Sequence, residues 1–164
     1  MPALVLFAFF MLALFLESTL LDYARVAGVK PDLVLVLVVF HAIVRGPREG
    51  ALWGFIGGIA QDILTGNYIG LNALVKMLTG YGVGLGETAF YKDSAVIVAG
   101  ITWLATIFAG MVTYLLLLTL EVFIPLAEAI TRVILPVSVY NLAVALLLYK
   151  RFYLWETKGI LPPR

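Results

Sequence analysis

Long apolar stretches separated by short polar ones divide the chain into six segments. A helix that crosses the hydrocarbon core of a bilayer needs about 20 apolar residues, and about 17–25 are tolerated. The pattern therefore predicts an all-α integral membrane protein, a single bundle of six transmembrane helices. The predicted spans are 3–21, 32–45, 49–64, 69–87, 94–120 and 128–149. They form a transmembrane domain over 1–149, followed by a short basic and aromatic tail, 150–164.

The second predicted span is shorter than the others. From Asp32 to Val44 it has thirteen residues, which is about 20 Å of helix. Pro31 suits a first helical position, and the carboxylate of Asp32 is favourable at a helix N-terminus. A helix this short either thins the bilayer around it or is sheltered by its neighbours.

The basic residues predict the orientation of the bundle. With the N-terminus inside, seven lie in the inner segments: Arg45, Arg48, Lys92, Lys150, Arg151, Lys158 and Arg164. The outer segments hold two, Arg25 and Lys30. Because cytoplasmic loops carry an excess of Lys and Arg, both termini are expected to be cytoplasmic, with the chain crossing the membrane several times.

The composition agrees with a membrane protein. Of 164 residues, 63% are hydrophobic and 13% charged, with a mean hydropathy of +1.06, which leaves too few polar residues to cover a soluble domain. A net charge of +1 gives no indication of a nucleic-acid partner. In the tail, Phe152, Tyr153 and Trp155 lie beside basic residues and predict an interfacial anchor, with a partner-docking patch as the alternative.

Polar residues gather around the turn between the third and fourth spans. They are Gln61, Asp62, Asn67, Asn72 and Lys76. An isolated charge at membrane depth costs at least about 2.5–3.5 kcal/mol, so Asp62 and Lys76 are expected to pair. Two interpretations remain open: a clamp that holds the two helices together, or a polar cavity that opens to the outside and binds a ligand.

Glycines recur at every fourth position of the same two spans. The rows contain Gly50, Gly54 and Gly58 in the third span and Gly80 and Gly84 in the fourth. Small residues at this spacing allow membrane helices to approach closely. A hairpin symmetric about Asn67 would set Asp62 opposite Asn72, Gly58 opposite Lys76, Gly54 opposite Gly80, and Gly50 opposite Gly84.

A second polar pair is possible between Glu17, late in the first span, and Arg132, early in the sixth. The two side chains either meet or reach the outer interface separately. Pro136 is expected to free the carbonyl of Arg132 and bend the sixth helix. No catalytic, cofactor-binding or metal site is predicted, because His41 is the only histidine and cysteine is absent.

Three motifs in this order resemble the bacterial rod shape-determining protein family MreD. They are Pro31-Asp32-Leu33 at the start of the short span, "RGPREGALWGFIGGIAQDILTG" (45–66) and "GLNALVKMLTGYGVG" (70–84). Lys76 stands where a small or apolar residue is expected. The resemblance covers nearly the whole chain and implies a subunit of the machinery that elongates the cell and synthesises peptidoglycan. Its implied partners are MreC, by direct contact, and MreB and the pair of RodA with a penicillin-binding transpeptidase, in the same complex.

The sequence is therefore compatible with two functions. The first is a non-enzymatic scaffold that binds the transmembrane segment of MreC. The alternative follows from a similarity of the six-helix arrangement to the substrate-binding S components of energy-coupling-factor transporters. In that case the chain would be a small-molecule or lipid-precursor binding and transport subunit with a polar cavity facing outward.

Overall fold

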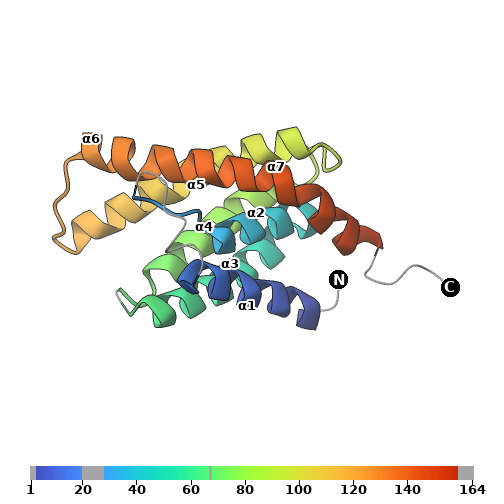
Figure 1. Ribbon diagram of the computed structural model, residues 1–164, viewed down its shortest axis with the longest axis horizontal. Helices are drawn as coiled ribbons and strands as arrows, with labels where there is room; N and C mark the ends of the chain where they lie inside the picture. Colours follow the sequence, from blue (N-terminus) through green and yellow to red (C-terminus); the bar gives the residue numbers. More distant parts are fainter. Residues whose placement is uncertain (1–2, 20–27, 67, 159–164) are drawn as a thin grey trace.

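The computed structural model describes residues 3–19, 28–66 and 68–158. These residues form helices and no strand, as predicted. The helices are α1 (Ala3–Thr19), α2 (Leu33–Arg45), α3 (Pro47–Thr65), α4 (Leu71–Leu85), α5 (Ala95–Thr119), and a last one built continuously from α6 (Leu126–Ala129), η1 (Ile130–Ile134) and α7 (Leu135–Lys158) (Figure 1).

Successive helices run in opposite directions along the bundle. The start of α1, the end of α7 and the α4–α5 connection lie together at one end, which we call the terminal end (Figure 1). The α3–α4 turn and the α5–α6 connection lie at the other, which we call the hairpin end. Such an arrangement is the one expected of an even number of membrane crossings.

The short helix α2 lies in the centre of the bundle. It contacts α1, α3, α4, α5 and α7. Between Val34 and Ile43, every residue except Leu37 is buried. Asp32 caps the helix, since its Oδ1 accepts the N–H of Leu35 at 2.8 Å. The thirteen-residue helix is therefore sheltered by its neighbours, which is one of the two alternatives left open by its length.

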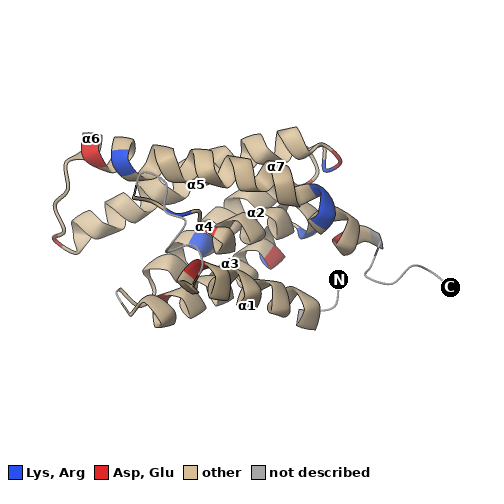
Figure 2. Cartoon of the chain, viewed as in Figure 1, with Lys and Arg blue, Asp and Glu red and all other residues tan. Residues whose placement is uncertain are grey.

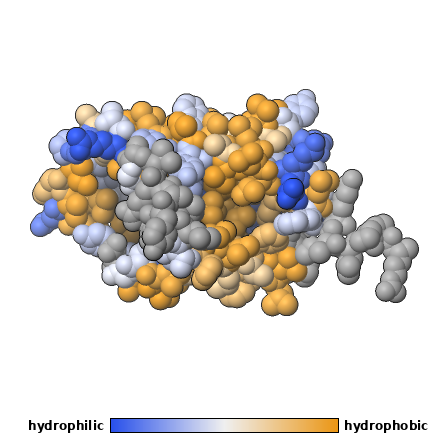
Figure 3. Space-filling model, in the orientation of Figure 1, coloured by the Kyte–Doolittle hydropathy of each residue, from blue (hydrophilic) through white to orange (hydrophobic). Residues whose placement is uncertain are grey.

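Hydrophobic side chains cover much of the outer surface. Two helices are long and apolar enough to cross a membrane, Ala95–Thr119 and Leu126–Thr157, and α1 and α2 are shorter apolar helices. Exposed leucines such as Leu104 and Leu147 lie on the two long helices. Apolar residues cover much of the face shown in Figure 3, and Figure 2 shows charged residues near both ends of the bundle and, further in, on α3 and α4. This distribution is that of a membrane protein.

Helices α3 and α4 make the closest helix pair. A Cβ added to Gly50 would overlap the carbonyl of Gly80, and one added to Gly54 would overlap the carbonyl of Lys76. Gly58 lies in the same way against Ala73, and Gly84 lies against Pro47. All five glycines of the two rows thus lie where one helix backbone meets the other, without room for a side chain.

The register of this pair differs from the symmetric one by about one helical turn. Gly50 faces Gly80 rather than Gly84, and Gly54 faces Lys76 rather than Gly80. The cause is at the turn: α3 continues to Thr65, whereas the N-terminus of α4 lies level with Asp62, which binds it. The last turn of α3 therefore extends past the start of α4, and a hairpin symmetric about Asn67 is wrong.

The final helix does not end at residue 149 but continues to Lys158. Phe152 and Glu156, in the segment interpreted as a tail, are buried. The carboxylate of Glu156 lies 2.6 Å from Nε of Arg45 at the end of α2. This segment is thereby packed onto the bundle at the terminal end.

Candidate functional site

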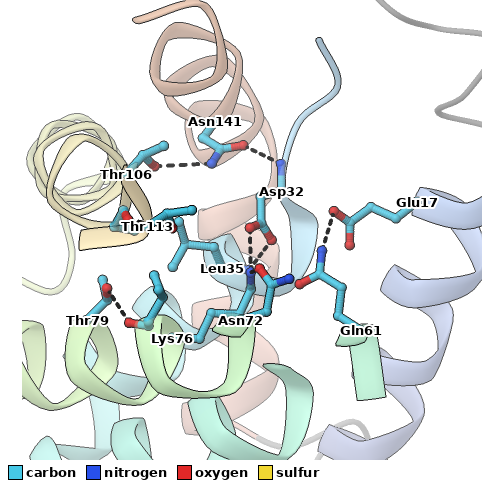
Figure 4. Close-up of polar contacts among 12 residues, drawn as sticks. Glu17, Asp32, Leu35, Gln61, Asn72, Lys76, Thr79, Thr106, Thr113 and Asn141 are labelled. Carbon is cyan, nitrogen blue, oxygen red and sulfur yellow. Dashed lines mark hydrogen bonds and ion pairs between the residues drawn. The ribbon is translucent and has the colours of Figure 1, made fainter. Parts of the chain in front are cut away.

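Polar side chains from all parts of the chain meet near the hairpin end of the bundle (Figure 4). We call these side chains the polar layer. They belong to helices α1, α3, α4, α5 and α7 and to the N-cap residue of α2. The members are Glu17, Asp32, Gln61, Asp62, Asn72, Lys76, Thr106 and Asn141. Seven of the eight belong to helices, and Asp32 is the N-cap of α2. The layer is therefore a property of the folded bundle rather than of the α3–α4 hairpin alone.

Asp62 is the acceptor for the start of α4. Its carboxylate accepts the backbone N–H of Gly70 at 2.9 Å, of Asn72 at 3.2 Å and of Ala73 at 3.2 Å. It also accepts the side-chain amide of Asn72 at 2.9 Å. The first N–H groups of a helix have no partner within the helix, and the positive end of its dipole favours an anion. These bonds explain how Asp62 is buried, with 1% exposure, although no described residue forms an ion pair with it.

Lys76 pairs with Asp32 and not with Asp62. Its Nζ lies 2.6 Å from Oδ2 of Asp32 and 3.2 Å from Oδ1 of Asn72. Asn72 thus bridges the two acids, because its amide group donates to Asp62 while its oxygen accepts from Lys76. The prediction of a direct Asp62–Lys76 pair is wrong, since the shifted register brings the ammonium to the start of α2 and Asp62 is already occupied by α4.

The polar layer continues from Asp32 into the second half of the chain. Oδ1 of Asn141 accepts the backbone N–H of Asp32 at 2.9 Å. The amide of Asn141 donates to Oγ1 of Thr106 at 3.1 Å. Asp32, Asn141 and Thr106 were not predicted from the sequence as site residues. Asp32 could have been found as a carboxylate at the start of an apolar helix, and Asn141 as a lone asparagine inside a span. A threonine such as Thr106 is common in spans and gives little indication of a site.

Glu17 and Arg132 do not meet. Gln61 donates from Nε2 to Oε1 of Glu17 at 3.3 Å. Arg132 instead pairs with Glu128, one turn earlier in its own helix, at 3.0 Å. The helix is π-helical over Ile130–Ile134, just before Pro136. Asn67, the remaining member of the predicted polar set, lies outside the described residues.

A cavity of about 430 Å³ adjoins the polar layer. Its floor is polar and includes Asp32, Asn72, Lys76 and Thr106. Its walls come mainly from α5 and from the helix that begins at Leu126. The structure therefore places part of the predicted polar set at a cavity, although Lys76 and Asp32 also hold helices together there.

An apolar groove lies on another side of the bundle, between α1 and α7 with α2 as its floor. It encloses about 280 Å³. The lining residues are Phe9, Leu12, Ala13, Leu16, Leu33, Val36, Leu37, Phe40, Val144, Leu148, Arg151, Phe152 and Trp155. Toward the terminal end, the rings of Phe9 and Trp155 approach to 5.2 Å between centroids.

His41 is buried beside Glu49, with Nε2 3.4 Å from the carboxylate. The ring also lies edge-on to Trp53, at 6.1 Å between centroids. Within the described ranges, no group of three or more His, Asp or Glu residues is placed to hold a metal ion. His41 is a packed histidine in contact with an acid.

Residues 1–158 match the family described as rod shape-determining protein MreD. The chain belongs to the MreD family. No curated protein and no solved structure gives a significant match. MreD proteins are membrane-associated and determine rod shape, so the chain has a role in cell shape and belongs to the rod-shape machinery.

Proposed function

We propose that this MreD protein is a non-enzymatic scaffold in the bacterial cytoplasmic membrane that binds the transmembrane segment of MreC. In this proposal all six helices cross the membrane and both termini are cytoplasmic, as the distribution of basic residues suggests. The observation that carries the proposal is the apolar groove between α1 and α7.

The groove has the chemistry of a helix-binding surface. Among the described residues, Arg151 is the one charged residue that lines it, and it lies at the terminal end, where a membrane helix would reach the interface. Helix α1 contacts α2 and α3, and of the α2 residues that line the groove, Leu33 and Leu37 are partly exposed. Ala13 is a small residue in the wall, and small residues allow the close approach on which helix association in membranes depends.

MreC is the occupant that this groove fits best among the partners of the rod-shape machinery. A single membrane-spanning helix presents apolar side chains over its whole length, and it needs one groove rather than a broad surface. MreB and the RodA–transpeptidase synthase would then join the same complex through MreC, without a separate site on this chain.

Copurification with tagged MreC in mild detergent tests the proposal. Leu148→Trp would fill the groove from α7, where the side chain is half exposed and has room to change. We expect this variant to retain about tenfold less MreC than the parent, a loss of about 1.4 kcal/mol. The neighbouring Leu147 is 77% exposed and does not line the groove, so Leu147→Trp is the matched control and should retain MreC normally.

Two results would contradict the proposal. One is a parent protein that purifies alone when MreC is present in the same membrane. The other is undiminished MreC with Leu148→Trp. MreB or the synthase copurifying from cells that lack MreC would show that these partners contact the chain directly.

The cavity beside the polar layer supports a second candidate function, a binding subunit similar to an S component. Its volume of about 430 Å³ falls within the range of small-molecule sites. Genes for an ATPase pair and a coupling protein beside this one would favour transport, whereas neighbouring shape genes would favour the scaffold.

A further inference from the structure

The cavity beside the polar layer has a polar floor with hydrogen-bond donors to spare. An ammonium group has three N–H donors. The described residues supply Lys76 with two acceptors, Asp32 and Asn72, which leaves one N–H for a ligand. Of the two amide N–H groups of Asn72, one is donated to Asp62. The floor therefore offers donors to a ligand that brings acceptor oxygens.

The rest of the lining is largely hydrocarbon. It includes Leu35 and Val75 at depth and Leu117, Val133 and Val137 along the walls. Water molecules find no hydrogen-bond partners along such walls, whereas a hydrocarbon chain fills the space between them without losing hydrogen bonds. A ligand that satisfies both floor and walls has an apolar chain with oxygen acceptors at one end.

The charges that the described residues contribute to the lining cancel one another. Lys76 is paired with Asp32 on the floor, and Arg132 with Glu128 at the rim. A small free anion would therefore meet no excess positive charge, and it would leave the apolar walls unfilled. An amphiphile needs no such excess, because its chain supplies part of the binding free energy.

One wall is built from irregular helix. The π-helical turn Ile130–Ile134 contributes Arg132, Val133 and Ile134 to the lining. π-helical turns are rare, and they often mark functional sites. Here the turn lies directly against the cavity, and Val133 is half exposed beside it, so the wall reaches the outer surface of the bundle.

We propose that this cavity binds one hydrocarbon chain of a phospholipid, with an ester or phosphate oxygen accepting the free N–H of Lys76. The surrounding bilayer supplies the ligand past Val133. The inference develops the second candidate function and does not depend on binding of MreC, which uses the groove on the other side of α2.

Photo-crosslinking tests this assignment. The full chain in detergent would be mixed with a phosphatidylglycerol that carries a photoactivatable diazirine in one acyl chain, and the adducts mapped by mass spectrometry. We expect adducts on the cavity wall, at Tyr114, Leu117 or Val133. Thr113→Phe would fill the cavity from α5 and should lower this labelling about tenfold.

The matched control is Leu115→Phe. Leu115 is two residues from Thr113 on the same helix, is 57% exposed and does not line the cavity. Labelling of the cavity wall in Leu115→Phe should therefore equal that in the parent. If Thr113→Phe fails to accumulate, Val133→Trp fills the cavity from the exposed rim instead. Lys76→Gln tests the floor and should weaken retention of the lipid.

Other outcomes overturn the proposal. Labelling confined to lipid-facing residues such as Leu115, or unchanged in a folded Thr113→Phe variant, would mean that only annular lipid is bound. Inorganic phosphate that raises the unfolding temperature of the parent but not of Lys76→Gln, without any lipid adduct in the cavity, would identify a small-anion site instead.

Discussion

The ammonium of Lys76 lies 2.6 Å from the carboxylate of Asp32, and both groups belong to the layer that joins the helices at the hairpin end. The side chain of Lys76 is 2% exposed and that of Asp32 is 23% exposed. Asp32 also caps α2, the helix at the centre of the bundle. One ion pair thus ties α4 to the element on which most other helices pack.

Breaking this pair from one side should destabilise the protein strongly. Lys76→Met leaves Asp32 without its cation, and one-sided loss of a buried pair typically costs about 3–5 kcal/mol. The double variant Asp32→Asn with Lys76→Met keeps an N-cap side chain and removes both charges, so it should recover much of the loss. Thermal unfolding in detergent measures the stability of the single and the double variant. A Lys76→Met variant as stable as the parent would show that the two charges are solvated separately.

The role of Asp62 should be separable from that of Lys76. Asp62→Ala removes the acceptor for the start of α4, and loss of such a cap costs about 0.5–2 kcal/mol. A double-mutant cycle should give a larger coupling for Asp32 with Lys76 than for Asp62 with Lys76, because only the first pair is in direct contact. Equal couplings would contradict the partners seen in the structure.

The α3–α4 contact should reject even one added methyl group. Gly54→Ala and Gly80→Ala would each place a Cβ into the opposite backbone, which cannot move aside as a flexible side chain can. Overpacking of this kind costs about 1–3 kcal/mol or more. The measurement is the unfolding temperature of each purified variant.

Gly82 is the matched control for these variants, since it lies in α4 with nothing within 4 Å of an added Cβ. Gly82→Ala should be neutral or stabilising by up to about 1 kcal/mol, because alanine favours the helix. Equal losses for Gly80→Ala and Gly82→Ala would indicate a propensity effect rather than close packing.

The orientation of the bundle can be tested by reporter fusions. Fusions at Arg48, Lys92 and the C-terminus should report the cytoplasm, since these positions carry the excess of basic residues. Fusions at Lys30 and Asn67 should report the outside. A cytoplasmic signal at Asn67 would rule out six membrane crossings with both termini inside.

Most of the helices could be predicted from the hydrophobic pattern because their apolar segments, apart from the short second one, are long enough to be recognised individually. The start of α2 at Pro31-Asp32 and the spacing of Gly50, Gly54 and Gly58 are equally local signals, and the structure has a helix start and a close helix contact at those places. The polar cluster was also visible, since charged and amide side chains are rare in such a chain.

What the sequence determined by itself was the number of helical segments, their approximate bounds and which residues are too polar to face lipid alone. The tertiary structure decided which polar side chains bind one another. Lysine has a long side chain that can reach more than one carboxylate. With α3 and α4 shifted by one turn, Lys76 pairs with Asp32 on another element rather than with Asp62 on the neighbouring helix. That shift depends on how Asp62 binds the start of α4, and on where α2 lies among five neighbours, which no local pattern encodes.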